Sequence, residues 1–190
     1  MLPAPVAPAT PRLRLRQWRD SDRAAFAAMN VDPAVMRYFA GLLSAASSDR
    51  NIDAWQQALA ERGWANRAVE LRATGQFIGC VGLSIPRRLF AFSSCVEIGW
   101  RLARAHWGQG QATEAARAAL RVGFDLLQLQ QVVSFTSLVN APSRALMQRI
   151  GMTHSGEDFE APALPDGSPL RRHCRYRRTG DRWRAHRAAD

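Results

Sequence analysis

The first part of the chain alternates charged and apolar residues and then changes to the spacing of amphipathic helices. In RLRLRQW, which begins at Arg12, arginine alternates with leucine, the pattern of a half-exposed strand. Three segments with apolar residues on one face follow. They are predicted as helices: one capped by Asp20 or Ser21 and ending at Met29, a short one over PAVMRYF with Pro33 in its first turn, and one over Asp49–Arg62.

The middle of the chain changes to strand patterns. WANRAVELR and QFIGCVGLSI flank a turn at Thr74–Gly75 and therefore predict a hairpin. Gly79 and Gly82 lie inside the second of these strands, which indicates a bulge or a close approach of another backbone. A further strand is predicted over SCVEIGWRL, which begins at Ser94.

The last third alternates helix and strand patterns. A helix is predicted from about Gln111 to Leu127, a strand over QVVSFTSLV, and a helix over PSRALMQRI with Pro142 at its start and Gly151 as its stop. Two more strands are expected at Met152–Glu160 and Arg171–Arg178. The order β-α-α-α-β-β-β-α-β-α-β-β has no internal repeat and no linker, so a single mixed α/β domain is predicted over residues 12–183. Residues 1–11, with four prolines, are expected to form a disordered arm and residues 184–190 a tail.

Composition limits the classes of function. A chain of 190 residues can bury a substantial core. Its net charge is +10, and every basic residue other than histidine is arginine. This charge is explained by a general preference for arginine and alanine, by attraction to an anionic ligand, or by both.

Metal, disulfide, secretory and membrane signals are not found. Cys80, Cys95 and Cys174 are far apart and form no CxxC pair, and no histidine stands at ligand spacing to them. Neither a zinc site nor a disulfide framework is expected. The first residues lack the pattern of a signal peptide, and no apolar run approaches the roughly 18 residues of a membrane span. A cytoplasmic protein without a metal or membrane contact is therefore expected.

The segment RAHWGQGQATEAARAAL, from Arg104 to Leu120, has the features of an anion-binding helix start. Gly108 and Gly110 leave backbone N–H groups uncovered, and a helix N-terminus adds partial positive charge. A nucleotide P-loop needs a lysine after its last glycine, where this chain has Gln111. A dinucleotide fingerprint needs a third glycine, where Thr113 stands. The segment therefore matches neither the P-loop nor the dinucleotide fingerprint.

The motifs together resemble the GNAT superfamily of acyl-CoA N-acyltransferases, and within it the ribosomal-protein-alanine/serine acetyltransferase-like branch. EIGWRLARAHWGQGQATEAARAAL and NAPSRALMQRIGM carry the resemblance, which extends from about Arg12 to Trp183 through LRLRQWRDSD, VMRYF, GQFIGCVGL and RRHCRYRRTGDRW. The superfamily motif Q/R-x-x-G-x-G/A falls on residues 107–112, with Trp107 in place of Gln or Arg, similar to what this branch carries. The resemblance implies a mostly antiparallel twisted sheet flanked by helices, with a V-shaped splay between its two central strands.

The resemblance also implies where acetyl-CoA binds. The cofactor is expected between EIGWRL and VVSFTSLV, with the exposed backbone of Arg101 and Leu102 pairing with the pantetheine amides and the pyrophosphate on the N–H groups of the glycine loop. Arg101 and Arg104 either add charge near the phosphates or are solvated, and Asn140 and Ser143 either contact the pantetheine arm and the sulfur or cap a helix. The expected cofactor-binding residues are Arg101, Leu102, Trp107, Gly108, Gln109, Gly110, Gln111, Ala112, Thr113, Asn140 and Ser143.

Two residues are expected to carry the chemistry. Glu97 is the candidate base for the acceptor amine, because a carboxylate is unusual on an apolar strand. The alternative is a Glu97 paired with an arginine on an exposed face, and Glu160 and His154 are other candidates for the base. Met147 stands where many members have a tyrosine acid, so the leaving thiolate is served by Ser143, by water or by no group.

The expected activity is direct acetyl transfer from acetyl-CoA to a primary amine, either a protein N-terminus or a small amine. VMRYFAGLL and EDFEAPALPDG are the segments expected to set acceptor specificity. A non-catalytic acyl-CoA-binding or RNA/ribosome-binding module is the alternative, motivated by the net charge and by the basic end RRHCRYRRTGDRWR. No direct nucleic-acid partner is expected for the enzyme, which is a monomer or a homodimer.

Overall fold

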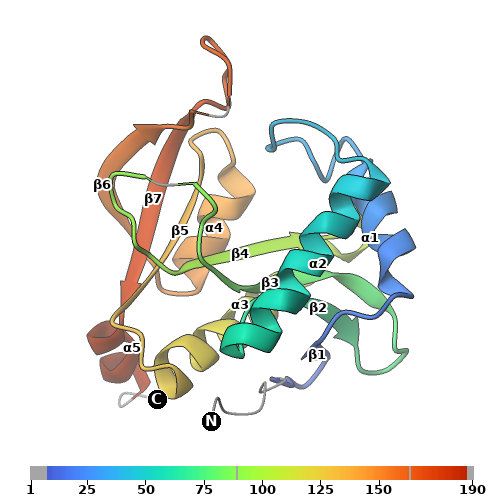
Figure 1. The fold of residues 1–190 in the computed structure, drawn as a ribbon. Coiled ribbons are helices and arrows are strands. Elements are labelled where there is room, and N and C mark those ends of the chain that lie inside the picture. The colour runs from blue at the N-terminus through green and yellow to red at the C-terminus, as the bar shows by residue number, and fades with distance from the viewer. Residues whose placement is uncertain (1–7, 89, 163, 188–190) are drawn as a thin grey trace.

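The computed structural model describes residues 8–88, 90–162 and 164–187 as a mixed α/β fold built on one seven-stranded sheet (Figure 1). The strand order is β1-β2-β3-β4-β5-β7-β6, and all neighbours are antiparallel except β4 and β5. The strands are β1 (Leu13–Arg16), β2 (Asn66–Leu71), β3 (Phe77–Ser84), β4 (Glu97–Leu102), β5 (Gln131–Ser137), β6 (Thr153–Glu160) and β7 (Arg172–Thr179). The helices are α1 (Asp22–Asn30), α2 (Ala45–Arg62), α3 (Gln111–Arg121), α4 (Ala141–Arg149) and α5 (Gly180–Arg187).

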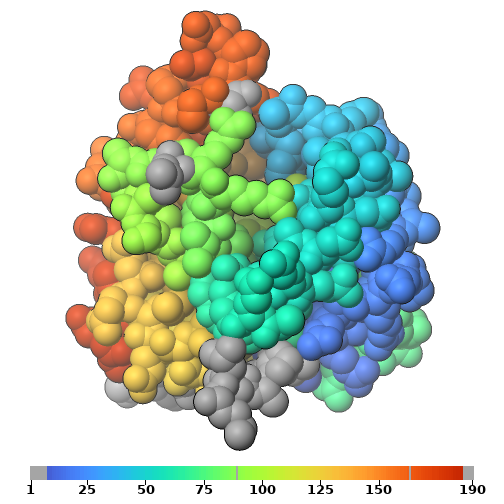
Figure 2. All heavy atoms as spheres, in the orientation of Figure 1, coloured from blue at the N-terminus to red at the C-terminus, as the bar shows by residue number. Residues whose placement is uncertain are grey.

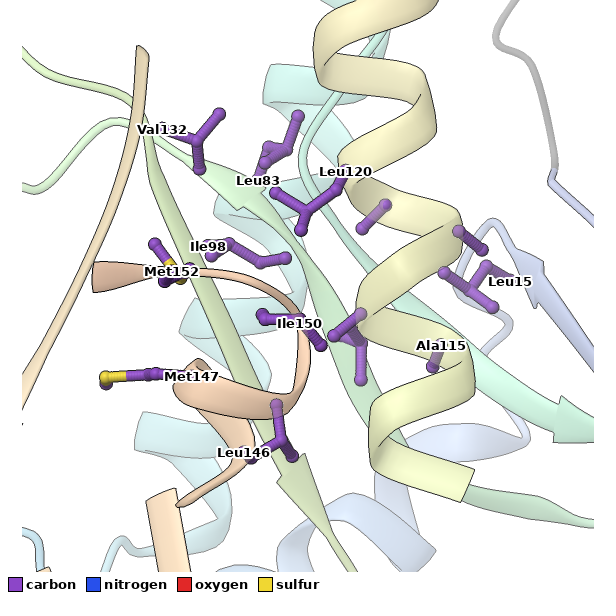
Figure 3. Packing of buried hydrophobic residues seen from close by; sticks show 14 of the residues in the cluster. Leu15, Leu83, Ile98, Ala115, Leu120, Val132, Leu146, Met147, Ile150 and Met152 are labelled. Carbon is purple, nitrogen blue, oxygen red and sulfur yellow. The ribbon is translucent and has the colours of Figure 1, made fainter. Parts of the chain in front are cut away.

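Helices cover both faces of the sheet. The side chains of a strand alternate between the faces, so each strand contributes to two separate cores. On one face, Ala68 and Cys80 pack with residues of α1 and α2. On the other, α3 and α4 enclose the larger core, where Ile98 of β4 and Leu120 of α3 meet Ile150, the residue that follows α4 (Figure 3).

The two glycines inside β3 are confirmed as points of close backbone approach. A Cβ at Gly82 would lie 2.4 Å from the carbonyl oxygen of Ala65, and one at Gly79 would lie 2.2 Å from that of Arg101. Gly79 also has a φ of +146°, and the β2–β3 register shifts opposite it. Both the bulge and the close approach are therefore present, because only glycine leaves room for the neighbouring strands.

Several predicted boundaries differ from the structure. PAVMRYF is not a helix but a series of turns, because the carboxylate of Asp32 accepts from the Ala34 N–H at 2.8 Å and favours a local turn. Helix α2 begins at Ala45, four residues before its predicted start, since the Ser44 hydroxyl caps it by accepting from the Ser47 N–H.

The remaining differences lie in the later elements. The strand predicted from Ser94 begins at Glu97. Helix α3 ends at Arg121 and continues as a π-helical turn over Val122–Leu126. Helix α5 begins after the predicted strand Arg171–Arg178, where no element was predicted, and it includes residues 184–187 of the expected tail.

The expected arm falls only in part within the described residues, since residues 1–7 lie outside them. Thr10 is 5% exposed, and its hydroxyl contacts the Leu13 carbonyl and the Glu114 carboxylate. Residues 8–11 thus pack against the start of α3.

A buried ion cluster fixes the start of α1 to the sheet. The Arg16 guanidinium donates to both carboxylate oxygens of Asp22 at 2.7 and 2.8 Å, and its Nε donates to Glu70 of β2. All three residues are at most 6% exposed. Burial opposes ionisation of Asp22, but the hydrogen bonds from Arg16 and from the Arg19 amide prevail and lower the pKa of Asp22.

Asp22→Asn should lower the free energy of unfolding by about 3 kcal/mol at neutral pH, because it leaves the buried Arg16 guanidinium with one of its two partner charges. Urea titration of both proteins measures the difference. Since the folded-state pKa of Asp22 is depressed, this stabilisation is complete above the ordinary carboxyl pKa and is lost as the pH falls through the folded value.

Asp20→Asn is the matched control, because the Asp20 carboxylate pairs with Arg23 but is 91% exposed. It should change the unfolding free energy by well under 1 kcal/mol. Equal losses in the two variants would contradict the role given to the buried cluster.

Candidate functional site

Strands β4 and β5 part in the middle of the sheet. They share a single residue pair, Glu97 with Val133, where the Val133 N–H donates to the Val96 carbonyl at 2.9 Å. On the outer sides, six consecutive pairs join β3 to β4 and seven join β5 to β7. The gap is therefore flanked by paired strands on both sides, and it leaves main-chain groups without a strand partner.

The main-chain groups of successive residues in β4 point alternately toward β3 and toward the gap. The Val96 carbonyl points to β5, whereas the Ala103 N–H donates to Ile78 in β3. The groups of Trp100 and Leu102 consequently face the gap, and those of Arg101 face β3. This differs from the expectation that the Arg101 backbone is exposed there. The Leu102 carbonyl already accepts from the Trp107 indole at 2.9 Å.

Two helix N-termini converge at the open end of the gap. Because β4 and β5 are parallel, both C-terminal ends lie at the same edge. β4 leads through the glycine loop into α3, and β5 leads into α4. Helix N-termini at the carboxyl ends of neighbouring parallel strands are a common setting for anionic ligands.

The glycine loop is fixed from within and open outward. Gly108 and Gly110 have φ values of +73° and +75°, a conformation that glycine adopts without strain. The Gln109 side chain donates to the Ala105 carbonyl at 2.9 Å. A Cβ at Gly108 would meet nothing within 4 Å, and no side chain caps α3 at Gly110. The N–H groups of the first turn, over residues 111–113, thus lack a side-chain cap.

Arg12 supports this loop, and the sequence analysis did not identify it. Its Nη1 donates to the Gln109 carbonyl at 3.0 Å, and its Nε donates to Glu114 of α3 at 2.6 Å. The two partners lie about a hundred residues further along the chain, so no local pattern signals this contact.

Asn140 caps α4, which is one of the two roles expected for it. Its Oδ1 accepts from the Ser143 N–H at 3.2 Å, and its Nδ2 donates to Thr136 at 2.8 Å. The Ser143 hydroxyl forms no hydrogen bond to any of the described residues and is half-buried in the first turn of α4. Met147 is 1% exposed and points away from α3 (Figure 3), so it fills the core.

Glu97 stands at the apex of the gap, where β4 and β5 meet. Its carboxylate has no hydrogen bond or ion pair to the described part of the chain, which does not support the alternative of an arginine-paired surface residue. Burial raises the pKa of Glu97 to about 8. Such a group exchanges a proton near neutral pH. The other candidates are paired at the surface: His154 with Asp158 at 3.1 Å and Glu160 with Arg171 at 2.8 Å.

The Arg101 side chain lies on the face of Glu97, away from the glycine loop. Alternation places residues 97, 99 and 101 together on the face of α1 and α2. Arg101 Nη1 donates to the Asn30 Oδ1, and its guanidinium stacks over the Phe39 ring at 4.2 Å. The expectation of charge near the phosphates does not hold for the Arg101 side chain.

Aromatic rings line the same face beyond Glu97. Phe135 of β5 shares the face of Val133, the partner of Glu97. It belongs to a cluster whose ring centroids lie 5.0 to 5.9 Å apart and whose members are Phe90, Phe92, Phe135 and Phe159. Phe159 comes from EDFEAPALPDG, one of the two segments expected to set acceptor specificity.

Part of the basic C-terminal segment has a structural role. Arg178 is 6% exposed, donates to the Ile150 carbonyl and stacks on Trp183 at 4.7 Å. Within residues 8–88, 90–162 and 164–187, no helix combines the length and apolar character needed to cross a membrane. The same part of the chain holds no cluster of three His, Cys, Asp or Glu residues suited to a metal ion.

Comparison with known proteins identifies relatives over most of the chain. Residues 12–153 match the model of the acetyltransferase (GNAT) domain. The chain is 35% identical over 149 residues to the uncharacterized protein YkkB of Bacillus subtilis, covering 77% of this chain and 84% of that protein. It is 36% identical over 87 residues, or 46% of this chain and 37% of the relative, to a protein of Aspergillus fumigatus named FsC-acetyl coenzyme A-N(2)-transacetylase.

A solved structure has the same fold. The acetyltransferase from Agrobacterium tumefaciens superposes with a TM-score of 0.74 at 28% identity, covering 91% of this chain and 94% of that one. The seven-stranded, mostly antiparallel sheet and its flanking helices agree with such structures. By its domain match and its relatives, this chain belongs to the GNAT family and is an N-acetyltransferase.

Proposed function

We propose that the protein transfers an acetyl group from acetyl-CoA directly to a primary amine. The observation that carries this proposal is the gap between β4 and β5, with the N-termini of α3 and α4 at its open end. An extended pantetheine arm fits there as an added strand, pairing with the main-chain groups of Trp100 and with the N–H of Leu102, which face the gap. The name of the Aspergillus relative includes acetyl coenzyme A, which supports acetyl-CoA as the acyl donor.

The pyrophosphate of the cofactor is assigned to the glycine loop and the first turn of α3. The open space over Gly108 and the uncapped N–H groups support this assignment. The proposed contacts come from Trp107, Gly108, Gln109, Gly110, Gln111, Ala112 and Thr113.

Glu97 is proposed as the base. The amine nitrogen attacks the acetyl carbonyl, its proton passes to Glu97 directly or through a water molecule, and the C–N bond forms as the C–S bond breaks. The position of Glu97 at the apex of the gap, and its lack of a partner charge among the described residues, support this role.

We place the leaving thiolate of coenzyme A beside the start of α4. The Ser143 hydroxyl, which has no partner among the described residues, is the proposed donor. Asn140 uses both ends of its amide to order this turn, so its proposed contribution to pantetheine binding is chiefly to shape the helix start. The acceptor, a protein N-terminus or a small amine, is placed on the face of α1 and α2.

Thr113→Asp should weaken acetyl-CoA binding about tenfold or more, because a carboxylate would face the pyrophosphate at close range. Isothermal titration with acetyl-CoA measures the affinity. The aspartate lies in the first turn of α3, where negative charge favours the helix, so the fold should not suffer. Thr113→Asn is the neutral control of the same shape. Equal affinity in the two variants would place the pyrophosphate elsewhere.

Glu97→Gln should lower kcat/KM about 100-fold or more and flatten its pH profile. In the unaltered enzyme, the pKa of about 8 predicts a rate that rises with pH and levels above 8, as Glu97 becomes a carboxylate. Measuring coenzyme A release from pH 6 to 9 compares the profiles.

The stability of the two proteins gives a second readout. Because the folded-state pKa of Glu97 lies above the ordinary value, the protein should lose stability relative to Glu97→Gln as the pH rises from about 4.5 through 8. Glu61→Gln, on the exposed surface of α2, is the control and should change neither profile. A full rate in Glu97→Gln would reject the role of base.

A further inference from the structure

Arg101 is a charged side chain without a partner charge in a mostly apolar setting. The described residues place no carboxylate within ion-pair distance of its guanidinium. Its neighbours are Phe39, at 4.2 Å, and the fully buried Phe26, at 5.8 Å. Burial lowers the pKa of Arg101, as expected for a cation that has lost water and gained no counter-charge. An arginine in such surroundings normally has an anionic partner.

One nitrogen of this guanidinium is open. Nη1 donates to Asn30, whose own side-chain amide donates to Ser48 at 2.9 Å, so the arginine is held in place from the α1 side. Among the described residues the Nε is enclosed and has no hydrogen-bond partner, whereas Nη2 is neither bonded nor enclosed. Nη2 is therefore the donor of Arg101 that the carboxylate of a ligand can reach, in a charge-assisted hydrogen bond.

Open space lies over the strand between Arg101 and Glu97. Gly99 lies between the two residues on the same face of β4, and a Cβ built there would meet no atom of the described residues within 4 Å. Glu97 and Arg101 are four residues apart, or about 13 Å along the strand. Figure 2 shows the surface hollowed between the green segment that precedes β4 and the blue to cyan residues between α1 and α2. A small molecule that occupies this space lies between the two side chains.

We propose that the acceptor is a small amine that also carries a carboxylate, with its amine at Glu97 and its carboxylate on Nη2 of Arg101. This inference rests on the proposed function and names the substrate class of the same site. The acceptor supplies the negative charge that Arg101 lacks, and it lies over Gly99. Amines without an anionic group, and polyamines above all, are disfavoured because they leave the guanidinium unpaired.

The test compares acceptors that differ only in the carboxylate. L-Phenylalanine is paired with 2-phenylethylamine, L-leucine with 3-methylbutylamine, and 6-aminohexanoate with hexylamine. Coenzyme A release gives kcat and KM, and titration of the enzyme–coenzyme A complex registers an acceptor that binds without reacting. At least one carboxylated amine should be preferred in kcat/KM or in affinity by roughly ten- to hundredfold, the range for a hydrogen bond to a charged group.

Arg101→Gln should abolish this preference, chiefly through KM, so that the ratio within the pair approaches one. Arg101→Lys should restore part of it, because lysine keeps the charge but not the planar guanidinium and its several donors. Arg121→Gln removes an exposed positive charge from α3, on the other face of the sheet, and should keep the ratio of the unaltered enzyme. A merely structural role of Arg101 predicts a lower rate with both members of a pair and an unaltered ratio.

Gly99→Val tests the open space separately. The position has no positive φ and a vacant Cβ direction, so valine fits the strand without a clash. It should raise KM for the carboxylated acceptor at least tenfold while thermal unfolding is preserved.

The outcomes separate the two proposals. If acetyl-CoA does not bind the unaltered enzyme, the proposed function fails and the inference fails with it. If acetyl-CoA binds but no pair shows a preference for the carboxylate, or if the preference survives Arg101→Gln, only the carboxylate-bearing acceptor is overturned.

Discussion

The arrangement of the molecule depends on one interrupted strand pairing. β4 and β5 meet at a single residue pair, while their outer edges are fully paired to β3 and β7. Unpaired backbone therefore remains available within an otherwise continuous sheet. Since the two strands are parallel, the helices that follow them start at the same edge. The single pair thus determines where a strand-like, anionic ligand can lie.

Local signals in the sequence were sufficient for the parts of the site that belong to one segment. The glycine loop, the helix start at Pro142 and the close approaches at Gly79 and Gly82 each depend on the backbone preferences of one or two residues. The support of the loop by Arg12 and the direction of the Arg101 side chain depend on strand register and on residues far along the chain. Asp32 shows the reverse case, in which a short polar side chain overrides an apparent helical pattern.

Several of the arginines behind the net charge of +10 are engaged within the fold and are not available to ligands. Arg16 anchors α1 in a buried ion cluster, and Arg178 binds a carbonyl beneath Trp183. Arg12 holds the glycine loop through a carbonyl and a carboxylate. In this lysine-free chain, arginine performs structural work that the planar, multidonor guanidinium suits better than an ammonium group does. Arg101 differs from these residues because its half-buried side chain faces the proposed acceptor site.

At Gly99, acceptor specificity can change without disturbing the fold. Most core positions resist change because a new side chain collides with its neighbours, as at Gly82, where the backbone of Ala65 is in the way. At Gly99 an added Cβ meets no atom of the described residues within 4 Å. A single substitution at Gly99 can therefore change the size of the proposed acceptor site at little cost in stability. Enzymes that share this sheet can diverge in the amines they accept through this position alone, while the cofactor gap stays as it is.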